Sequence, residues 1–130
     1  MCFCSHSNDD KLYTIGLFLY FYQEYRILIY LYWMYDDNSD NGIGLKRHFY
    51  EMINVSDYFI FVRSMYSELK IKGNFFDYLS IKQWCAWELG CFYNLNSTGF
   101  YINSFDSKSN LDNKLLDDFV LLENINNQLR

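Results

Sequence analysis

The chain is predicted to form an α/β fold of the flavodoxin-like class, a three-layer structure with a central parallel sheet of four to five strands flanked by helices. Three observations support this prediction. Short runs of β-branched and aromatic residues alternate with longer segments of helical periodicity. The apolar start of the chain leads directly into a polar loop at 5–10, and the uninterrupted run YFIFV at 58–62 is typical of a strand buried on both faces. Since 130 residues suit one domain, we expect a single unit spanning residues 1–130.

The first half of the chain contains two strand patterns and two helix patterns. Ser7 or Asp9 is placed to cap the first helix, and the β-branched and aromatic run at 27–35 predicts the second strand. The apolar face of the second helix consists of Leu45, Phe49 and Met52. The predicted elements are a strand at 1–4, a loop at 5–10, a helix at 10–25, a strand at 27–35, a turn-rich loop at 36–44 and a helix at 45–54.

The second half continues the alternation but contains a long connection. Residues 64–83 separate the third strand from the next helix, and we expect a short helix within them at 65–70. The tail has Leu111, Leu115, Phe119 and Leu122 at helical spacing, which predicts a final amphipathic helix and leaves no separate fifth strand obvious. The predicted elements are a strand at 57–63, a helix from Trp84, a strand at 99–102 and a helix at 110–129.

Charge and hydropathy exclude two classes of partner. The formal net charge is −5, and the short cluster Lys46-Arg47-His48 reads as a solvated helix face, so the basic surface of a nucleic-acid-binding protein is not visible. The apolar stretch 12–35 is interrupted by polar residues at 23–26, leaving pieces too short for the roughly 20 residues of a membrane span. No positively charged segment of a signal peptide precedes it. We therefore expect a cytoplasmic protein that binds neither nucleic acid nor membrane.

The four cysteines indicate buried thiols and no metal centre. Cys2 and Cys4 are two residues apart on a strand, so both side chains point to one face, which we expect to be the core. Cys85 and Cys91 lack the spacing of a metal or redox motif. His6 follows Cys4 closely, but a complete zinc ligand set is missing. Free thiols in a reducing compartment, with no metal or cofactor, are the expected state.

One motif carries a candidate functional carboxylate. In the run Trp84-Cys85-Ala86-Trp87-Glu88-Leu89-Gly90, Trp84 and Glu88 are four residues apart and therefore share a helix face. A carboxylate beside an indole at a helix start suits a ligand that contains a sugar and a ring. The alternative is a core stripe of tryptophan and leucine with a solvated glutamate, since most helical glutamates are surface charges.

Four segments resemble the Toll/interleukin-1 receptor (TIR) domain family, in that family's order and over roughly residues 1 to 105. FCSHSNDDK resembles its opening strand and loop, IYLYWMYDD its second strand, VSDYFIFVRS its third strand, and QWCAWELG its W-x-x-x-E helix. The last segment is most similar to bacterial TIR-like proteins of the Thoeris antiphage type.

This resemblance implies an enzyme that cleaves the nicotinamide–ribose bond of NAD+, with Glu88 as its catalytic residue and NAD+ as a substrate, so that no further cofactor is required. Nicotinamide in NAD+ is already a cationic leaving group, so a single carboxylate suffices, whereas ordinary glycosides need two. Loops after the first three strands of a doubly wound sheet converge at its carboxyl edge. The expected substrate-binding residues are Ser5, His6, Ser7, Asn8, Trp33, Asp36, Ser64 and Trp84.

Several of these residues have a simpler structural interpretation. Ser5, Ser7 and Asn8 lie where a helix N-terminus offers backbone N–H groups to a phosphate, but helix capping is the alternative role. Trp33 is expected to stack on a ring of the substrate, and Trp84 either does the same or packs the helix start onto the sheet.

One departure from the family pattern lies just before Trp33. Many relatives have an aspartate at this position, and here Tyr32 replaces it. Asp36 and Asp37 either compensate as acids or are only turn residues.

Other functions remain open from the sequence. The resemblance implies self-association through TIR–TIR contacts and a separate effector activated by the nucleotide product, which is either linear ADP-ribose or a cyclic isomer. The first alternative is a non-catalytic TIR module that acts as a scaffold through self-association. Further alternatives are an enzyme similar to nucleoside deoxyribosyltransferases, and a flavodoxin-like regulatory domain in which Glu88 is a surface residue.

Overall fold

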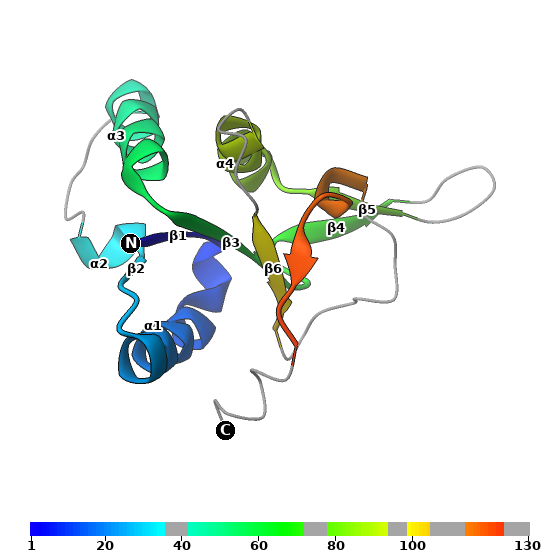
Figure 1. The fold of residues 1–130 in the computed structure, drawn as a ribbon. Coiled ribbons are helices and arrows are strands. Elements are labelled where there is room, and N and C mark those ends of the chain that lie inside the picture. The colour runs from blue at the N-terminus through cyan, green and yellow to red at the C-terminus, as the bar shows by residue number, and fades with distance from the viewer. Residues whose placement is uncertain (36–41, 72–77, 94–98, 105–113, 124–130) are drawn as a thin grey trace.

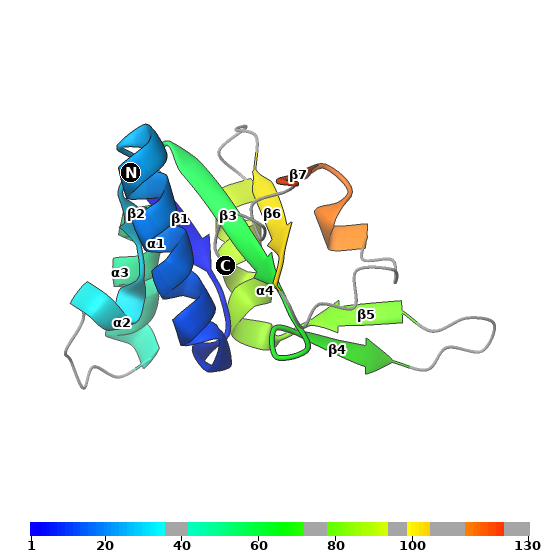
Figure 2. The ribbon, with the colours of Figure 1, turned by 90° about the horizontal axis from the view of Figure 1, so that it is seen from below.

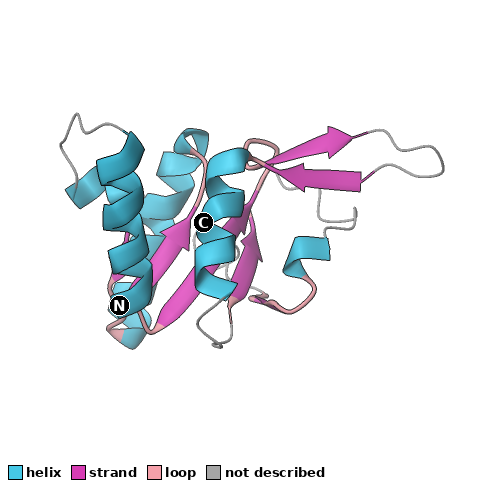
Figure 3. Ribbon diagram, turned by 90° about the horizontal axis from the view of Figure 1, so that it is seen from above, coloured by secondary structure: helices cyan, strands magenta, loops and turns pink. Residues whose placement is uncertain are grey.

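The computed structural model describes residues 1–35, 42–71, 78–93, 99–104 and 114–123. Its centre is a five-stranded sheet in which every neighbouring pair is parallel, in the order β2-β1-β3-β6-β7. The strands are β1 (Cys2–Ser5), β2 (Ile29–Tyr30), β3 (Tyr58–Arg63), β6 (Phe100–Asn103) and β7 (Val120–Leu121). Helix α1 (Lys11–Tyr25) covers one face of the sheet, while α3 (Gly42–Val55) and α4 (Gln83–Tyr93) cover the other (Figures 1 and 3). The predicted flavodoxin-like three-layer fold is therefore confirmed.

The central strand β3 is buried on both faces, as its continuous apolar run predicts. Phe59 and Phe61 belong to the core beneath α3 and α4, whereas Ile60 and Val62 belong to the core beneath α1. This alternation follows from the two-residue period of a strand. Cys2 and Cys4 lie together in the core beneath α1, as expected. All four cysteines are free thiols, and Cys91 is only partly buried where a buried thiol was predicted.

The 3₁₀ turn that precedes the first helix is capped by Ser7, one of the two predicted residues, whereas α1 itself has Asp10 at its N-cap and no side-chain cap bond. The Ser7 hydroxyl accepts the backbone N–H of Asp9 at the start of a 3₁₀ turn, η1 (Asn8–Asp10), which leads directly into α1. At the other end Arg26 adopts a left-handed conformation with φ of 55°, and its N–H bonds to carbonyls of the last helical turn. The predicted helix at 10–25 is therefore confirmed within one residue.

The second strand is much shorter than the predicted strand at 27–35. Only Ile29 and Tyr30 pair with β1, after which the chain enters a single helical turn, α2 (Tyr32–Tyr35). The turn is closed by a hydrogen bond from the N–H of Met34 to the carbonyl of Leu31. The aromatic run satisfies strand propensity, but at this edge of the sheet tertiary contacts override it.

The connection after β3 is a β-hairpin and not the short helix predicted at 65–70. Strands β4 (Glu68–Ile71) and β5 (Tyr78–Ile81) pair antiparallel and project beyond the main sheet (Figure 2). Before β4, the hydroxyl of Ser64 accepts the backbone N–H groups of Tyr66 and Ser67, and such local bonds compete with helix formation.

The tail contributes a fifth strand where a helix at 110–129 was predicted. The described part contains a 3₁₀ turn, η2 (Lys114–Leu116), followed by β7, which pairs with β6. A Cβ on Gly99 would lie 2.7 Å from the Phe119 ring, so the glycine permits the close approach of this segment to the start of β6. None of the helices in the described segments is long and apolar enough to cross a bilayer.

Candidate active site

The sheet changes direction of winding between β1 and β3. From β1 the chain moves outward to β2 and then returns to β3 on the other side of β1. Ser5 ends β1 and pairs with Phe61 in β3, which itself ends at Arg63. Ligands of doubly wound sheets bind outside the carboxyl ends of the strands at such a switch point. The topology therefore indicates the end of β1 as the candidate ligand site.

Glu88 from α4 meets the end of β1 at this switch point. The Ser5 Oγ donates a hydrogen bond of 2.7 Å to Glu88 Oε1, joining residues 83 positions apart in the chain. Glu88 is only 3% exposed, so the interpretation of Glu88 as a solvated surface charge is wrong. This hydrogen bond anchors one oxygen of the Glu88 carboxyl to the end of β1.

Burial sets the protonation of Glu88. Removal from water raises the pKa of this carboxyl from 4.5 to about 8, and the hydrogen bond from Ser5 lowers it only in part. Within the part of the chain that the structure describes, no lysine or arginine forms an ion pair with Glu88. A buried titratable group with a displaced pKa at a switch point is a candidate for catalysis.

The neighbouring thiols are structural. Burial raises the pKa of Cys85 to about 12 and that of Cys4 well above its usual range, with the carboxylate of Glu88 contributing to both shifts. These thiols therefore stay protonated at neutral pH and do not serve as nucleophiles. The described residues contain no group of three or more His, Cys, Asp or Glu arranged to hold a metal ion.

His6 follows Ser5 directly and is held by two hydrogen bonds. Its Nδ1 lies 3.1 Å from the Cys4 carbonyl oxygen, and its Nε2 lies 3.1 Å from Nε1 of Trp33. An indole N–H can only donate, so Nε2 is the acceptor and Nδ1 carries the proton. Burial lowers the pKa of His6 to about 4, which keeps the ring neutral.

Aromatic side chains from α2 gather around His6. Tyr32 stacks on the His6 ring with centroids 5.5 Å apart, and the Lys11 ammonium lies 5.6 Å from the centre of the Trp33 ring. Burial, with a contribution from Glu88, raises the pKa of Tyr32 to about 12. Tyr32 is thus a neutral phenol within electrostatic reach of Glu88.

Other predicted site residues have structural partners. The Ser64 hydroxyl donates to Asp10 Oδ2 at 2.5 Å, which ties the start of α1 to the end of β3. Ser7 caps η1, while Asn8 is exposed on the same turn. The structure thus joins Ser5 to Glu88 and His6 to Trp33 by hydrogen bonds and assigns Ser64 to the β3 turn. Asp36 and Asp37 lie outside the described residues.

Of the two roles predicted for Trp84, the structure shows packing and not a ring left free for a substrate. Its ring packs edge-on against Phe49 of α3 at 5.7 Å and stacks on Trp87 at 5.8 Å. Although Trp84 and Glu88 are separated by one helical turn, the indole packs against the core and the carboxyl meets Ser5.

Two residues near the site are absent from the sequence prediction. Asp10 is buried and accepts the Ser64 hydroxyl, and Lys11 is the one Lys or Arg among residues 1–25. Because no other Lys or Arg lies in this part of the sequence, Lys11 could have been identified as a candidate cation from the sequence alone. Nothing in the sequence distinguishes Asp10 from its exposed neighbour Asp9.

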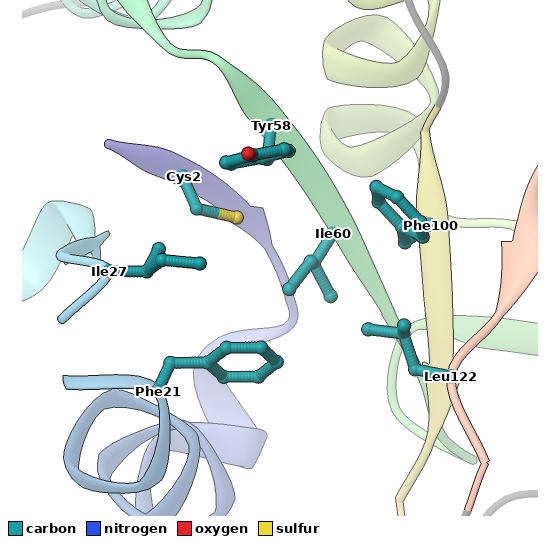
Figure 4. A pocket seen from close by; sticks show the side chains of 7 residues that line it. All are labelled: Cys2, Phe21, Ile27, Tyr58, Ile60, Phe100 and Leu122. Atoms are coloured by element: carbon teal, nitrogen blue, oxygen red, sulfur yellow. The ribbon is translucent and has the colours of Figure 1, made fainter. Parts of the chain in front are cut away.

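An apolar pocket of about 210 Å³ lies on the α1 face at the opposite end of the sheet (Figure 4). The residues lining it are Cys2, Phe21, Ile27, Tyr58, Ile60, Phe100 and Leu122. Cys2, Tyr58 and Phe100 begin their strands, whereas Ser5 ends β1. This pocket carries no carboxylate or cation and is separate from the Glu88 site.

A scan against protein-family models and searches of curated proteins and of solved structures found no match to this chain.

Proposed function

We propose that the protein is a TIR-like NAD+ nucleosidase that cleaves the bond between nicotinamide and ribose, with Glu88 as the catalytic residue. The observation that carries this proposal is the buried Glu88 carboxyl, bound by Ser5 at the switch point of the sheet. The resemblance in the four sequence segments supplies the substrate class. The fold alone would not, because flavodoxin-like sheets serve many functions.

The chemistry needs one anion beside the ribose. As the bond from ribose C1′ to the nicotinamide nitrogen breaks, its electron pair leaves with nicotinamide, and positive charge develops on the sugar. A carboxylate in a site of low dielectric stabilises that charge more strongly than it would in water. The cationic substrate in turn favours the ionised form of Glu88 and lowers its pKa when it binds.

The fate of the ribosyl cation decides the product. Capture by water yields ADP-ribose and a proton, while capture by the adenine base or a ribose hydroxyl of the same molecule yields a cyclic isomer. Following the resemblance, the product serves as a signal in antiviral defence in the cytoplasm and activates a separate effector. His6 is locked as a neutral acceptor, so proton transfer falls to water or to Glu88.

The experiment that tests this function compares wild type with Glu88→Gln. Concentrated protein is incubated with NAD+, and nicotinamide and ADP-ribose species are separated by chromatography. We expect nicotinamide release from wild type only, because glutamine keeps the volume and accepts the Ser5 hydroxyl but cannot carry the negative charge. Circular dichroism verifies the fold of the variant. Near-wild-type activity of Glu88→Gln contradicts the assignment.

A second candidate function is self-association without catalysis, and one surface favours it. Leu12, Ile15, Leu19 and Tyr22 form an exposed stripe along the outer side of α1, with Leu12 85% exposed. Spacings of three and four residues place them on one helix face, as in helix-pairing seams. Residues 12–23 contain no charged side chain. The second candidate predicts that Leu19→Glu reduces the mass measured by light scattering, whereas Val55→Glu, at an exposed position that ends α3, does not.

The two candidates are compatible if assembly completes the active site. In that case the specific activity of wild type rises with protein concentration, and Leu19→Glu lowers it at a given concentration. A specific activity that is independent of concentration separates catalysis from assembly.

A further inference from the structure

Trp33 is held in place by the side chain of the residue that follows β1, since its own backbone provides little support. It lies on the single turn of α2, directly after a strand of only two residues. Its Nε1–H donates to His6 Nε2, and His6 Nδ1–H donates in turn to the carbonyl of Cys4. The indole is therefore linked by two hydrogen bonds to the backbone of a central, buried strand.

We propose that His6 is a positioning residue whose neutral Nε2 fixes the Trp33 ring as a platform for the aromatic base of a nucleotide, with Lys11 beside it as the partner of the nucleotide's phosphate. The choice of a nucleotide rests on the proposed function. The positioning of Trp33 by His6 rests on the hydrogen bonds alone.

The position of Lys11 shows that one face of the Trp33 ring is accessible. Lys11 is an exposed residue at the start of α1, and its ammonium lies 5.6 Å from the centre of the ring. A base that stacks on this face replaces the ammonium there. Because the lysine stem is flexible, the displaced charge then reaches a phosphate attached to the same ligand. Lys11 thus provides a cation that the acidic chain otherwise lacks in residues 1–25.

Both hydrogen-bonding atoms of His6 are already engaged. The imidazole accepts a hydrogen bond from the Trp33 indole and donates one to the Cys4 carbonyl. The Tyr32 ring also stacks on it. His6 consequently acts through Trp33 and does not exchange a proton with the substrate.

Two substitutions of His6 separate this role from packing. In His6→Gln the side-chain oxygen replaces Nε2 as the acceptor for Trp33, whereas His6→Asn replaces only the Nδ1 contact with Cys4. The measurement is the ¹⁵N–¹H spectrum of the three tryptophan indoles, with the Trp33 signal assigned through Trp33→Phe. We expect the Trp33 signal to keep its position in His6→Gln and to move to that of a solvent-exposed indole in His6→Asn. If His6 only packs against β1, His6→Asn leaves the Trp33 signal in place, and the proposal is overturned.

Binding is tested in the Glu88→Gln background so that no turnover occurs. AMP and adenosine are titrated while the Trp33 indole signal is followed. Because one stacking contact is lost, His6→Asn is expected to weaken AMP binding by roughly tenfold or more, with partial recovery in His6→Gln. Lys11→Gln is expected to weaken AMP but not adenosine. Adenosine and AMP affected equally by Lys11→Gln would overturn the phosphate role.

The outcomes distinguish this inference from the proposed function. Nicotinamide release with an unchanged KM for NAD+ in His6→Asn retains the enzyme and rejects the platform. AMP binding at Trp33 without any NAD+ cleavage retains the platform and rejects the enzyme. A KM raised in His6→Asn and partly restored in His6→Gln, with a smaller effect on kcat, supports both.

Discussion

Two buried glutamates lie near the carboxyl edge of the same sheet, and their surroundings differ. Glu68 at the start of β4 meets Arg63 at the end of β3, with Nε to Oε1 at 2.8 Å and Nη2 to Oε2 at 3.2 Å. Glu88 on α4 meets the hydroxyl of Ser5. Exposure is 4% for Glu68 and 3% for Glu88, so burial alone does not separate them. The difference lies in the partner, a cation in one case and a neutral hydroxyl in the other.

The comparison indicates which glutamate holds the structure and which is available for chemistry. Arg63 also lies 5.6 Å from the centre of the Tyr101 ring, so the ion pair joins the hairpin to β3 and β6. Such a bidentate pair compensates both charges. Among the described residues no cation pairs with the Glu88 carboxyl, and burial without such a partner raises its pKa to about 8. An uncompensated carboxyl is costly for stability but ready to respond to a cationic substrate.

The largest effect is expected when the cation is removed from Glu68. Arg63→Met leaves a buried carboxylate without its partner, and such losses cost about 3–5 kcal/mol. Urea unfolding measures the decrease in the free energy of unfolding. In Arg63→Met/Glu68→Met no charge remains, and we expect most of the stability to return. A single substitution no more harmful than the double one would show that Glu68 does not depend on Arg63.

A second prediction concerns the pH dependence of stability that Glu88 imposes. The unfolded carboxyl ionises near its ordinary pKa of 4.5, while the folded one retains its proton up to about 8. Between these values the unfolded chain releases a proton that the folded chain keeps. Wild type therefore loses stability as pH rises, at up to about 1.4 kcal/mol per pH unit from this group, and the loss levels off above 8.

Glu88→Gln isolates this contribution because glutamine does not titrate. We expect the stability difference between Glu88→Gln and wild type to change in favour of the variant from pH 5 to pH 8, as measured by urea unfolding at each pH. Thermal unfolding of the same pair gives an independent check. A difference that stays constant over this window would mean that Glu88 is ionised in the folded protein.

The sequence predicts the elements whose signals are local. The continuous apolar run of β3 is confirmed, because it depends on the residues themselves and their immediate neighbours. Ser7 also acts as a cap, but the capped element is the 3₁₀ turn η1 and not α1. The wrong predictions at 27–35 and 110–129 lie at the two edges of the main sheet, where β2 and β7 owe their form to pairing with strands distant in the sequence. The wrong prediction at 65–70 falls on the separate two-stranded sheet, where β4 pairs with β5.

The candidate site shows the same division. The sequence identifies Glu88 and Ser5 as members of one site, and the structure brings them within hydrogen-bonding distance. Periodicity places Trp84 on the Glu88 side of a helix but cannot show that Phe49 and Trp87 cover its ring. The bond between His6 and Trp33 also escapes pattern reasoning, since it needs α2 in place of the end of a strand.

The smallest expected effect on stability, and the sharpest test of the comparison, is Ser5→Ala. Removing the hydroxyl takes away a bond that lowers the pKa of Glu88, so that pKa rises further above 8. The ionised form that the proposed catalysis requires then accumulates only at higher pH. If the protein cleaves NAD+, the rise of kcat/KM with pH moves to more alkaline values, while stability falls by roughly 1 kcal/mol.

The matched control for Ser5→Ala is Ser56→Ala, which deletes a hydroxyl bonded to the Met52 carbonyl at the end of α3. This substitution has a comparable effect on stability and should leave the pH profile of wild type unchanged. A profile that moves equally in both variants would mean that general destabilisation, and not the bond to Glu88, causes the shift. If instead only Ser5→Ala moves the pH profile, the Ser5 hydroxyl stabilises the charge of Glu88, as Arg63 does for Glu68. The hydroxyl does so weakly enough that the Glu88 carboxyl remains titratable.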